Sequence, residues 1–229
     1  INKYKKLGRE AAETIGNIAR EIEIGQFEKE IKAKIYSKLL RKNILPHLLI
    51  VGSDHRIFQY RHPISINKKI NKYIMIVLCA ERDGLIVNLS RLIHFGQPSF
   101  ELKEKLNAVA KIDAAFILNT RPGVKVDQVL EAGKKAYKKQ GYAGEWKNHH
   151  QGGATGYQTR EYIVTPEQKD IVQLNQPFTW NPSLRGVKSE DTILVRENEN
   201  EIITFDHSWP MLESSYNGEN IKRPDILIK

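Results

Sequence analysis

Apolar residues recur every three or four positions in two stretches near the start of the chain. Residues 4–22 place them on one side of a helix, and residues 27–42 resume the spacing after a break at Gly25. A period of about 3.6 residues predicts two consecutive amphipathic helices. Pro46 then ends the helical pattern, and the apolar run at 48–51 predicts a strand.

The same order of segments returns later in the chain. Residues 102–119 and 126–139 again have helical spacing, with Pro122 and Gly123 between them. A shift of 98 residues, which is the separation of Gly25 and Gly123, superposes both helix pairs and their breaks. We infer an internal duplication, because a fixed shift that preserves both pattern and break is typical of structural repeats.

Strand-like segments follow each helix pair. The continuous apolar run at 73–80 predicts a strand buried on both faces, and residues 84–94 are expected to pair with it antiparallel. The tail at 223–228 is expected to form an edge segment. Further short strands are expected at 155–164, 177–181, 186–195 and 201–205.

The alternation of helices and strands predicts the class of fold. Helices, strands, helices and strands in this order indicate a single α+β domain over residues 1–229, with pseudo-symmetric halves at about 1–98 and 99–229. In such a domain a binding site is expected in the crevice where the two halves meet.

Hydrophobic content, net charge and cysteine count predict where the protein is located and which kinds of partner it lacks. Hydrophobic residues make up 40% of the chain, which suffices for a core, and the net charge is +9. The lysines are spaced along helix faces among glutamates, and no nucleic-acid motif accompanies them, so we expect neither a nucleic acid nor a membrane as partner. One cysteine, Cys79, allows no intramolecular disulfide and favours a cytoplasmic location. Because the chain begins at Ile1, we expect a further segment upstream.

Five short motifs occur in an order that resembles a known family. They are Arg61-His62-Pro63, residues 88–91 (Asn-Leu-Ser-Arg), 152–156 (Gly-Gly-Ala-Thr-Gly), 179–182 (Thr-Trp-Asn-Pro) and 189–192 (Ser-Glu-Asp-Thr). Together with the paired helices they resemble the creatinase/aminopeptidase P family, which includes Xaa-Pro peptidases, methionine aminopeptidases and creatinase. The resemblance implies the pita-bread fold, a homodimer and an upstream N-terminal domain.

The metal ligands that the resemblance implies are mostly replaced. Active peptidases of the family hold two divalent ions, such as Mn, with two Asp, one His and two Glu. The matching positions here are Val77 (or, after a small shift, Cys79 or Glu81), Asn88, Gly153, Asn181 and Glu190. Neutral oxygen donors do not supply the charge that offsets dehydration of a divalent ion. We therefore expect no metal pair and no other cofactor.

The residues that remain match the substrate side of the family's site. His62 matches a histidine that contacts substrate, and the 98-residue shift places it opposite Arg160. Peptidases of the family have His-Glu at residues 160–161, whereas creatinase, which works without metal, resembles this chain in having Arg-Glu. The resemblance implies that Arg160 binds a substrate carboxylate, while His62, Glu161 and Glu190 transfer protons. We expect further substrate contacts from Asn88, His150, Gly153, Tyr157 and Asn181.

Simpler structural interpretations accompany these candidates. His62 is also compatible with capping a strand end, and Arg160, Glu161 and Glu190 with a buried ion cluster left from a lost site. His149 and His150 are not expected to bind one metal, because adjacent strand residues point to opposite faces. Cys79 and Trp180 are expected to be core residues.

Three functions are compatible with the sequence. The first is an Xaa-Pro peptidase-like enzyme that cleaves a peptide-like C–N bond. The second is a metal-free hydrolase like creatinase that acts on a small carboxylated amide or guanidino compound. The third is a catalytically inactive module that binds peptides or proteins. Because one fold supports many activities, the predicted fold does not choose among them.

Overall fold

The computed structural model describes residues 1–229, and its first part contains three helices and three long strands. These are α1 (Asn2–Glu21), α2 (Glu28–Leu40), β1 (Leu45–Ser53), α3 (His55–Gln59), β2 (Tyr73–Arg82) and β3 (Leu85–His94). The second part begins with α4 (Phe100–Asn119), α5 (Val126–Lys139) and the 3-10 turn η1 (Glu145–Asn148). None of the helices has both the length and the apolar composition needed to cross a membrane.

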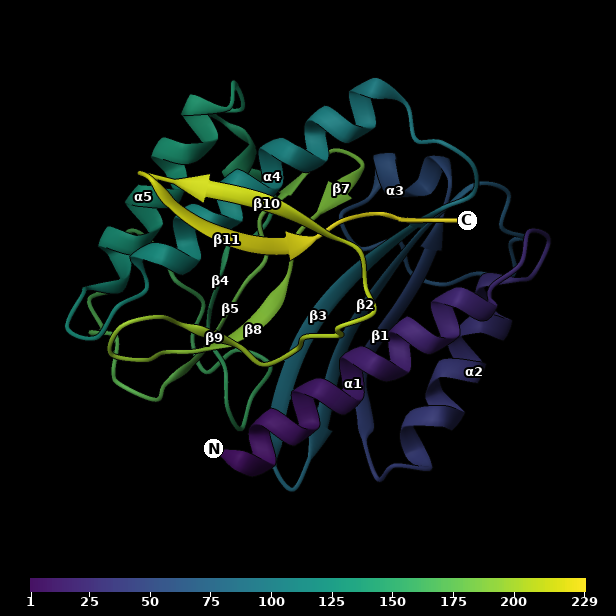
Figure 1. Ribbon diagram of the computed structural model, residues 1–229, viewed down its shortest axis with the longest axis horizontal. Helices are drawn as coiled ribbons and strands as arrows, with labels where there is room; N and C mark the ends of the chain where they lie inside the picture. The colour runs from purple at the N-terminus through teal and green to yellow at the C-terminus, as the bar shows by residue number, and fades with distance from the viewer.

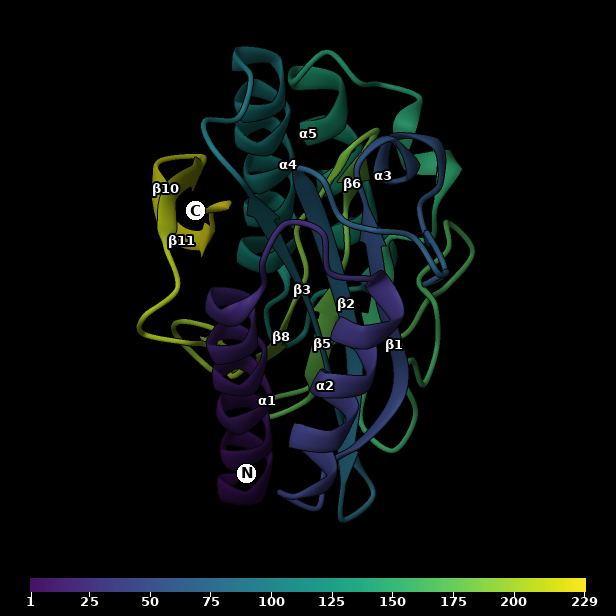
Figure 2. The same cartoon turned by 90° about the vertical axis from the view of Figure 1, so that its right-hand side faces the viewer.

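Short strands make up the rest of the second part. They are β4 (Gly152–Ala154), β5 (Pro177–Trp180), β6 (Ser183–Leu184), β7 (Val187–Lys188), β8 (Asp191–Leu194), β9 (Glu201–Ile202), β10 (Met211–Tyr216), β11 (Glu219–Pro224) and β12 (Leu227–Ile228). One sheet has the order β1-β2-β3-β12 and the other β4-β5-β8-β9. Helices α1 and α2 cover the first sheet, and α4 and α5 lie beside the second (Figure 1). Figure 2 shows the hairpin β10–β11 on the outer side of α4.

The β2–β3 hairpin confirms the predicted central strands. Its register runs from Tyr73 opposite His94 to Arg82 opposite Leu85. Both turn residues have positive φ, 55° at Asp83 and 80° at Gly84, as expected for a tight turn that matches the twist of paired strands. The apolar side chains of β2 alternate between two cores, one under α1 and α2 and one shared with the second half. This double burial is the reason for the uninterrupted apolar run.

Backbone hydrogen bonds confirm the two pseudo-symmetric halves. Gly25 N donates to Ile70 O (2.8 Å), and Gly123 N donates to Val172 O (2.9 Å). Both glycines have positive φ, 91° and 84°, which favours glycine at this break between paired helices. The helix breaks are 98 residues apart, whereas Ile70 and Val172 are 102 apart. The sequence offset therefore does not extend beyond the helix pairs, and it does not establish that His62 and Arg160 are equivalent.

Two strand predictions need correction, and the tail prediction holds. Residues 155–164 form no strand; β4 ends at Ala154, and the backbone then turns around the Glu161 side chain, which accepts hydrogen bonds from the N–H groups of Tyr157 and Gln158. The strand expected at 186–195 is divided into β7 and β8. The tail does form an edge strand, since β12 pairs with β3.

A buried ion network joins the C-terminal hairpin to the core. Arg223, which is 0% exposed, donates from Nε to Asp113 Oδ2 (2.8 Å) and from Nη2 to Asp191 Oδ2 (2.8 Å). Arg91 Nη2 donates to the other oxygen of Asp191 (2.9 Å). Burial raises the pKa of Asp113 to about 6 although Arg223 opposes this change. Strands β3, β8 and β11 and helix α4 thus meet in a set of two arginines and two aspartates.

Substitution Arg223→Met tests the importance of this network. We expect the free energy of unfolding to fall by about 3–5 kcal/mol, because Asp113 and Asp191 lose a shared buried cation. Urea unfolding measures the change. The control Lys222→Met removes the neighbouring cation, whose partner Glu213 lies 3.9 Å away on the exposed face, and should change the free energy by less than about 1 kcal/mol. Equal effects of the two substitutions would contradict the assignment.

Candidate functional site

Glu190 lies at the centre of the site, between β7 and β8. Its side chain is almost completely buried. Ser90 Oγ on β3 donates to Glu190 Oε2 (2.5 Å), and Ser90 N donates to the Glu190 carbonyl oxygen (3.0 Å). Arg160 Nη2 donates to Oε1 (3.1 Å), and Lys188 Nζ lies 3.2 Å from Oε2. One carboxylate therefore connects the first half of the molecule to two cations of the second.

The protonation state of Glu190 follows from these contacts. Burial raises the pKa of the carboxyl group, but Lys188, Arg160 and the Ser90 hydroxyl outweigh burial and lower it to about 2. Glu190 is consequently a carboxylate at neutral pH. It accepts hydrogen bonds, but at neutral pH it holds no proton to donate and is a weak base, so its proton-transfer role stays a prediction.

Asn88 and Asn181 stand at two former acid positions and are both buried. Asn88 Nδ2 donates to Thr179 Oγ1 (3.1 Å) and Thr155 Oγ1 (3.2 Å). The Oδ1 atoms of both asparagines are buried and have no hydrogen-bond partner in the protein. Buried carbonyl oxygens are rarely left unpaired, so each is a candidate acceptor for a ligand N–H group.

The register of the β2–β3 hairpin shows which of the three candidate positions, Val77, Cys79 or Glu81, lies beside Asn88. Asn88 lies directly opposite Cys79, whereas Val77 lies opposite Ser90 and Glu81 opposite Ile86. Cys79 is thus the residue beside Asn88, nine residues before it rather than eleven. Burial raises the pKa of its thiol to about 12, so Cys79 is neutral and unreactive at neutral pH.

The Gly153 position has no room for a side chain. A Cβ atom built there would lie 2.1 Å from the carbonyl oxygen of Tyr162. The backbone of Tyr162 occupies the space beside Gly153. Val164 N donates to Gly152 O (2.9 Å), and this hydrogen bond keeps the Tyr162 segment in place. A ligand histidine could stand at residue 153 only if the segment after Glu161 moved.

The side chains around Glu190 do not fit a pair of divalent ions. No three His, Cys, Asp or Glu side chains converge on a point where they could hold a metal. The one retained ligand, Glu190, already has a cationic group on each oxygen. A dinuclear centre needs several anionic ligands around the ions.

Three histidines gather beside the Glu190 cluster. His62 Nε2 lies 3.2 Å from His149 Nε2, and the His149 and His150 rings stack with centroids 4.4 Å apart. The expectation that residues 149 and 150 face opposite ways is wrong, because they follow η1 and lie outside any strand. Burial, reinforced by the charge of Lys188, lowers the pKa of His62 and lowers that of His149 to about 2. Burial and Arg160 lower the pKa of His150 to about 4.

Two predicted residues lie at an exposed turn rather than among these side chains. Glu161 Oε1 accepts hydrogen bonds from the backbone N–H groups of Tyr157 (2.6 Å) and Gln158 (3.1 Å). Tyr157 is 75% exposed and packs against Gly84. Both side chains lie at this exposed turn, and their catalytic and substrate-binding roles stay predictions.

Sequence reasoning missed Lys188, Ser90 and His149. Lys188 and Glu190 are two residues apart, and this spacing puts side chains on the same side of an extended segment, so it could have indicated Lys188. The contacts of Ser90 and His149 come from residues 100 and 87 positions away, and no local pattern reveals such pairs.

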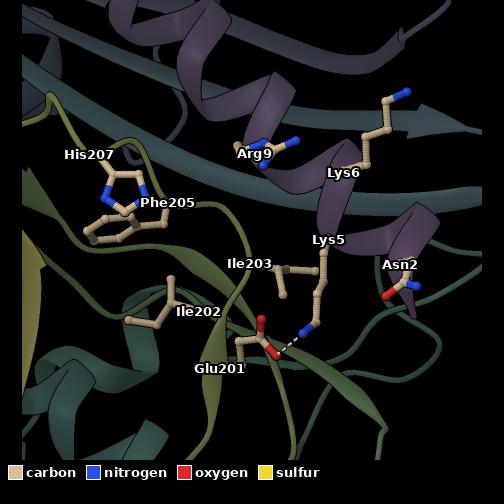
Figure 3. Close-up of a pocket in the computed structure, with 9 residues that line it drawn as sticks. All are labelled: Asn2, Lys5, Lys6, Arg9, Glu201, Ile202, Ile203, Phe205 and His207. Atoms are coloured by element: carbon tan, nitrogen blue, oxygen red, sulfur yellow. Dashed lines mark ion pairs between the residues drawn. The ribbon is translucent and has the colours of Figure 1, made fainter.

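Several open cavities lie outside this cluster. One, of about 390 Å³, is lined by α1 and residues 201–207, and its Lys5 and Glu201 form an ion pair at 2.7 Å (Figure 3). None of the predicted site residues lines it. Another, of about 340 Å³, is lined by Arg61 and Asn148, the chain neighbours of His62 and His149. This cavity is therefore lined by residues that are adjacent in sequence to two of the three histidines.

Replacement of Glu190 by Gln should change how stability depends on pH. The folded pKa of about 2 lies below the ordinary value of 4.5, so ionised Glu190 stabilises the fold above pH 4.5, and this contribution is lost as pH falls towards 2. Between pH 4.5 and about 2 the free energy of unfolding of the wild-type protein should decline as Glu190 is protonated. In Glu190→Gln this part of the decline should be absent. Urea unfolding across the window measures both. Glu213→Gln, at an exposed position, should retain the wild-type profile; an unchanged profile for Glu190→Gln would contradict the assignment.

Solved structures with the same architecture come from several peptidases. An X-Pro aminopeptidase from Thermotoga maritima superposes with a TM-score of 0.81 and 20% identity, covering 100% of this chain and 63% of its own. A prolidase from Pyrococcus horikoshii OT3 gives a TM-score of 0.81 and 21% identity over 89% of this chain and 61% of its own. A methionine aminopeptidase from Rickettsia prowazekii gives 0.71 and 16% over 89% of this chain and 96% of its own. These likenesses establish the pita-bread fold.

Sequence comparison gives the family. An uncharacterized peptidase of Staphylococcus aureus strain MW2 is 26% identical over 162 residues, which cover 68% of this chain and 46% of the relative. The chain thus spans about half the length of the curated relatives it matches. The model of metallopeptidase family M24 matches residues 2–197. The chain therefore belongs to metallopeptidase family M24, as a divergent member in which most of the family's metal-ligand positions hold other residues.

Proposed function

We propose that this M24 domain binds a small carboxylated or peptide-like substrate in its crevice and hydrolyses a C–N bond without a metal pair. The observation that carries the proposal is the cluster around Glu190, where the buried Lys188 and the partly buried Arg160 face a single carboxylate. Such a cluster attracts an anionic ligand. Prolyl dipeptides are included among the candidates because solved relatives of the same fold are an X-Pro aminopeptidase and a prolidase.

Arg160 supports the carboxylate part of the proposal. Its Nη2 donates to Glu190 and its Nη1 to the Thr159 carbonyl oxygen (2.6 Å). Its Nε is buried and has no partner in the protein. An arginine with a free Nε–H can receive a carboxylate oxygen on that side, and a charge-assisted hydrogen bond of this kind is strong.

His62 supports the proton-transfer part. Because its pKa is lowered, its imidazole is neutral at neutral pH and can accept a proton. In the proposed step His62 takes a proton from the attacking water, the C–N bond breaks, and the proton passes to the leaving nitrogen. The His149 ring packs edge to face against the His62 ring, and its Nε2 lies 3.2 Å from His62 Nε2. This contact orients the His62 imidazole.

A binding module without catalysis is the second candidate. Both oxygens of Glu190 are already engaged by Ser90, Arg160 and Lys188, so no buried carboxylate is free to act as a base. In that case the same crevice would bind a peptide or carboxylate and release it unchanged.

Ligand-induced stabilisation tests binding. In a thermal-shift series with small carboxylates, prolyl dipeptides and guanidino acids, at least one compound should raise the wild-type midpoint, since a ligand of the folded state stabilises it. Arg160→Ala should abolish this shift, whereas Arg121→Ala, which removes a partly exposed partner of Glu219, should retain it. A shift that survives Arg160→Ala would contradict the carboxylate role.

Turnover of the bound compound separates hydrolase from binding module. His62→Ala should lower kcat about 100-fold or more while leaving the thermal shift in place, because loss of a general base slows chemistry more than binding. Product formation by chromatography measures this. Unchanged turnover in His62→Ala would exclude the proton-transfer role, and no turnover of any bound compound would favour the binding module.

Metal analysis tests the proposed independence from a metal pair. Protein purified without a chelator and dialysed against manganese should retain far less than one ion per chain, because one carboxylate cannot balance two divalent ions. Elemental analysis after removal of free metal gives the ratio. Near-stoichiometric retention of two ions would contradict the proposal.

A further inference from the structure

We propose that Lys188 is the second half of an anion site, in which its ammonium group and Arg160 take the place of a metal pair and together bind one oxyanion group, such as a ligand carboxylate. The inference rests on the proposed function, because it assigns a second cation to the same site. Lys188 was not among the residues that the sequence indicated, and no family ligand position corresponds to it.

The position of Lys188 supports this role. It lies on β7, is only 4% exposed, and places Nζ 3.2 Å from Glu190 Oε2. Its one ion pair is with Glu190, and an ammonium group carries three N–H donors. Donors therefore remain for a second acceptor in the crevice.

The arrangement around Glu190 resembles a bridging carboxylate. Arg160 binds Oε1 and Lys188 binds Oε2, so each oxygen has its own cation. A carboxylate that bridges two metal ions has the same disposition of charges, and such ions bind and polarise anionic or carbonyl oxygens. Two organic cations keep that preference for oxygen anions without coordinating a metal.

The charge balance of the cluster favours an anionic ligand. The cluster contains two cations and one carboxylate, which leaves one uncompensated positive charge in a buried place. The adjoining network is balanced, since Asp113 and Asp191 are paired with Arg223 and Arg91. Burial keeps the thiol of Cys79 neutral by raising its pKa and keeps the histidines neutral by lowering theirs. A buried charge without a partner is costly, so a monoanionic ligand would stabilise this site.

The uncharged side chains of Asn88 and Asn181 are also consistent with a site that binds an anion. Asn88 and Asn181 are buried and uncharged, so neither adds a negative charge that would offset the cations of the cluster. Their unpaired Oδ1 atoms also leave acceptors for an N–H group of the ligand. The ligand class is therefore a monoanion with a carboxylate and a nearby N–H donor.

Acetate binding to Lys188 variants tests the inference. Wild-type protein, titrated with sodium acetate against sodium chloride at constant ionic strength, should show a saturable rise in thermal midpoint. Lys188→Met should weaken acetate binding by about tenfold or more, because it removes a hydrogen bond to a charged group, and Lys188→Arg should restore most of it. Lys222→Met, which alters an exposed lysine, is the matched control and should bind acetate as wild type does.

NMR titration of the histidines needs no ligand, so it tests the inference even if Lys188→Met changes the stability of the protein. The charge of Lys188 helps to lower the pKa of His62 and of His149, so NMR titration of the folded Lys188→Met protein should give higher values for both, and Lys188→Arg should not. Unchanged histidine pKa values in Lys188→Met would place the ammonium outside the site and overturn the inference.

The outcomes distinguish this inference from the proposed function. Acetate binding that is lost in Arg160→Ala but kept in Lys188→Met overturns the role of Lys188 and leaves the proposed function standing. Acetate binding that is lost in both variants supports the two-cation site, even if no amide is ever hydrolysed. Failure of the wild-type protein to bind acetate overturns the anion site itself.

Discussion

The contact between Ser90 and Glu190 is the interaction on which the site depends. Ser90 belongs to β3 of the first half, and it binds Glu190 of the second half through both its hydroxyl group and its backbone N–H. Arg160 and Lys188 then converge on the same carboxylate. Without this buried acid the two cations would have no partner, and the crevice would carry repulsion in place of an ordered cluster.

The residues at the ligand-like positions and the nearby cations differ in charge from a dinuclear metal centre. A dinuclear centre combines several acids with two divalent ions, whereas the positions that match its ligands here hold one acid, Glu190. Three former ligand positions hold Asn88, Gly153 and Asn181, while Arg160 and Lys188 supply the positive charge. The backbone also excludes a side chain at residue 153, since the carbonyl of Tyr162 fills the space where it would stand. The cluster around Glu190 is therefore a polar, mostly buried group of side chains within the fold of the family.

Most of the architecture could be predicted from local patterns. Helical spacing, the breaks at Gly25 and Gly123, and the apolar run of β2 each reflect a constraint that acts within a few residues. The short strands were less predictable, because their length depends on side chains from elsewhere. The segment after Ala154, for example, turns because Glu161 binds the backbone at residues 157 and 158.

The sequence by itself determined the paired helices, the central hairpin, the repeated helix pair, and the neutral residues Asn88 and Asn181 at positions that resemble ligand positions of the family. Only the tertiary structure decided that Cys79 rather than Val77 lies beside Asn88, that His149 meets His62, and that Lys188 joins Arg160 on Glu190. The physical reason is the range of the interactions. Periodicity and turns arise between near neighbours, whereas strand register and the pairing of buried charges arise between segments that only folding brings together.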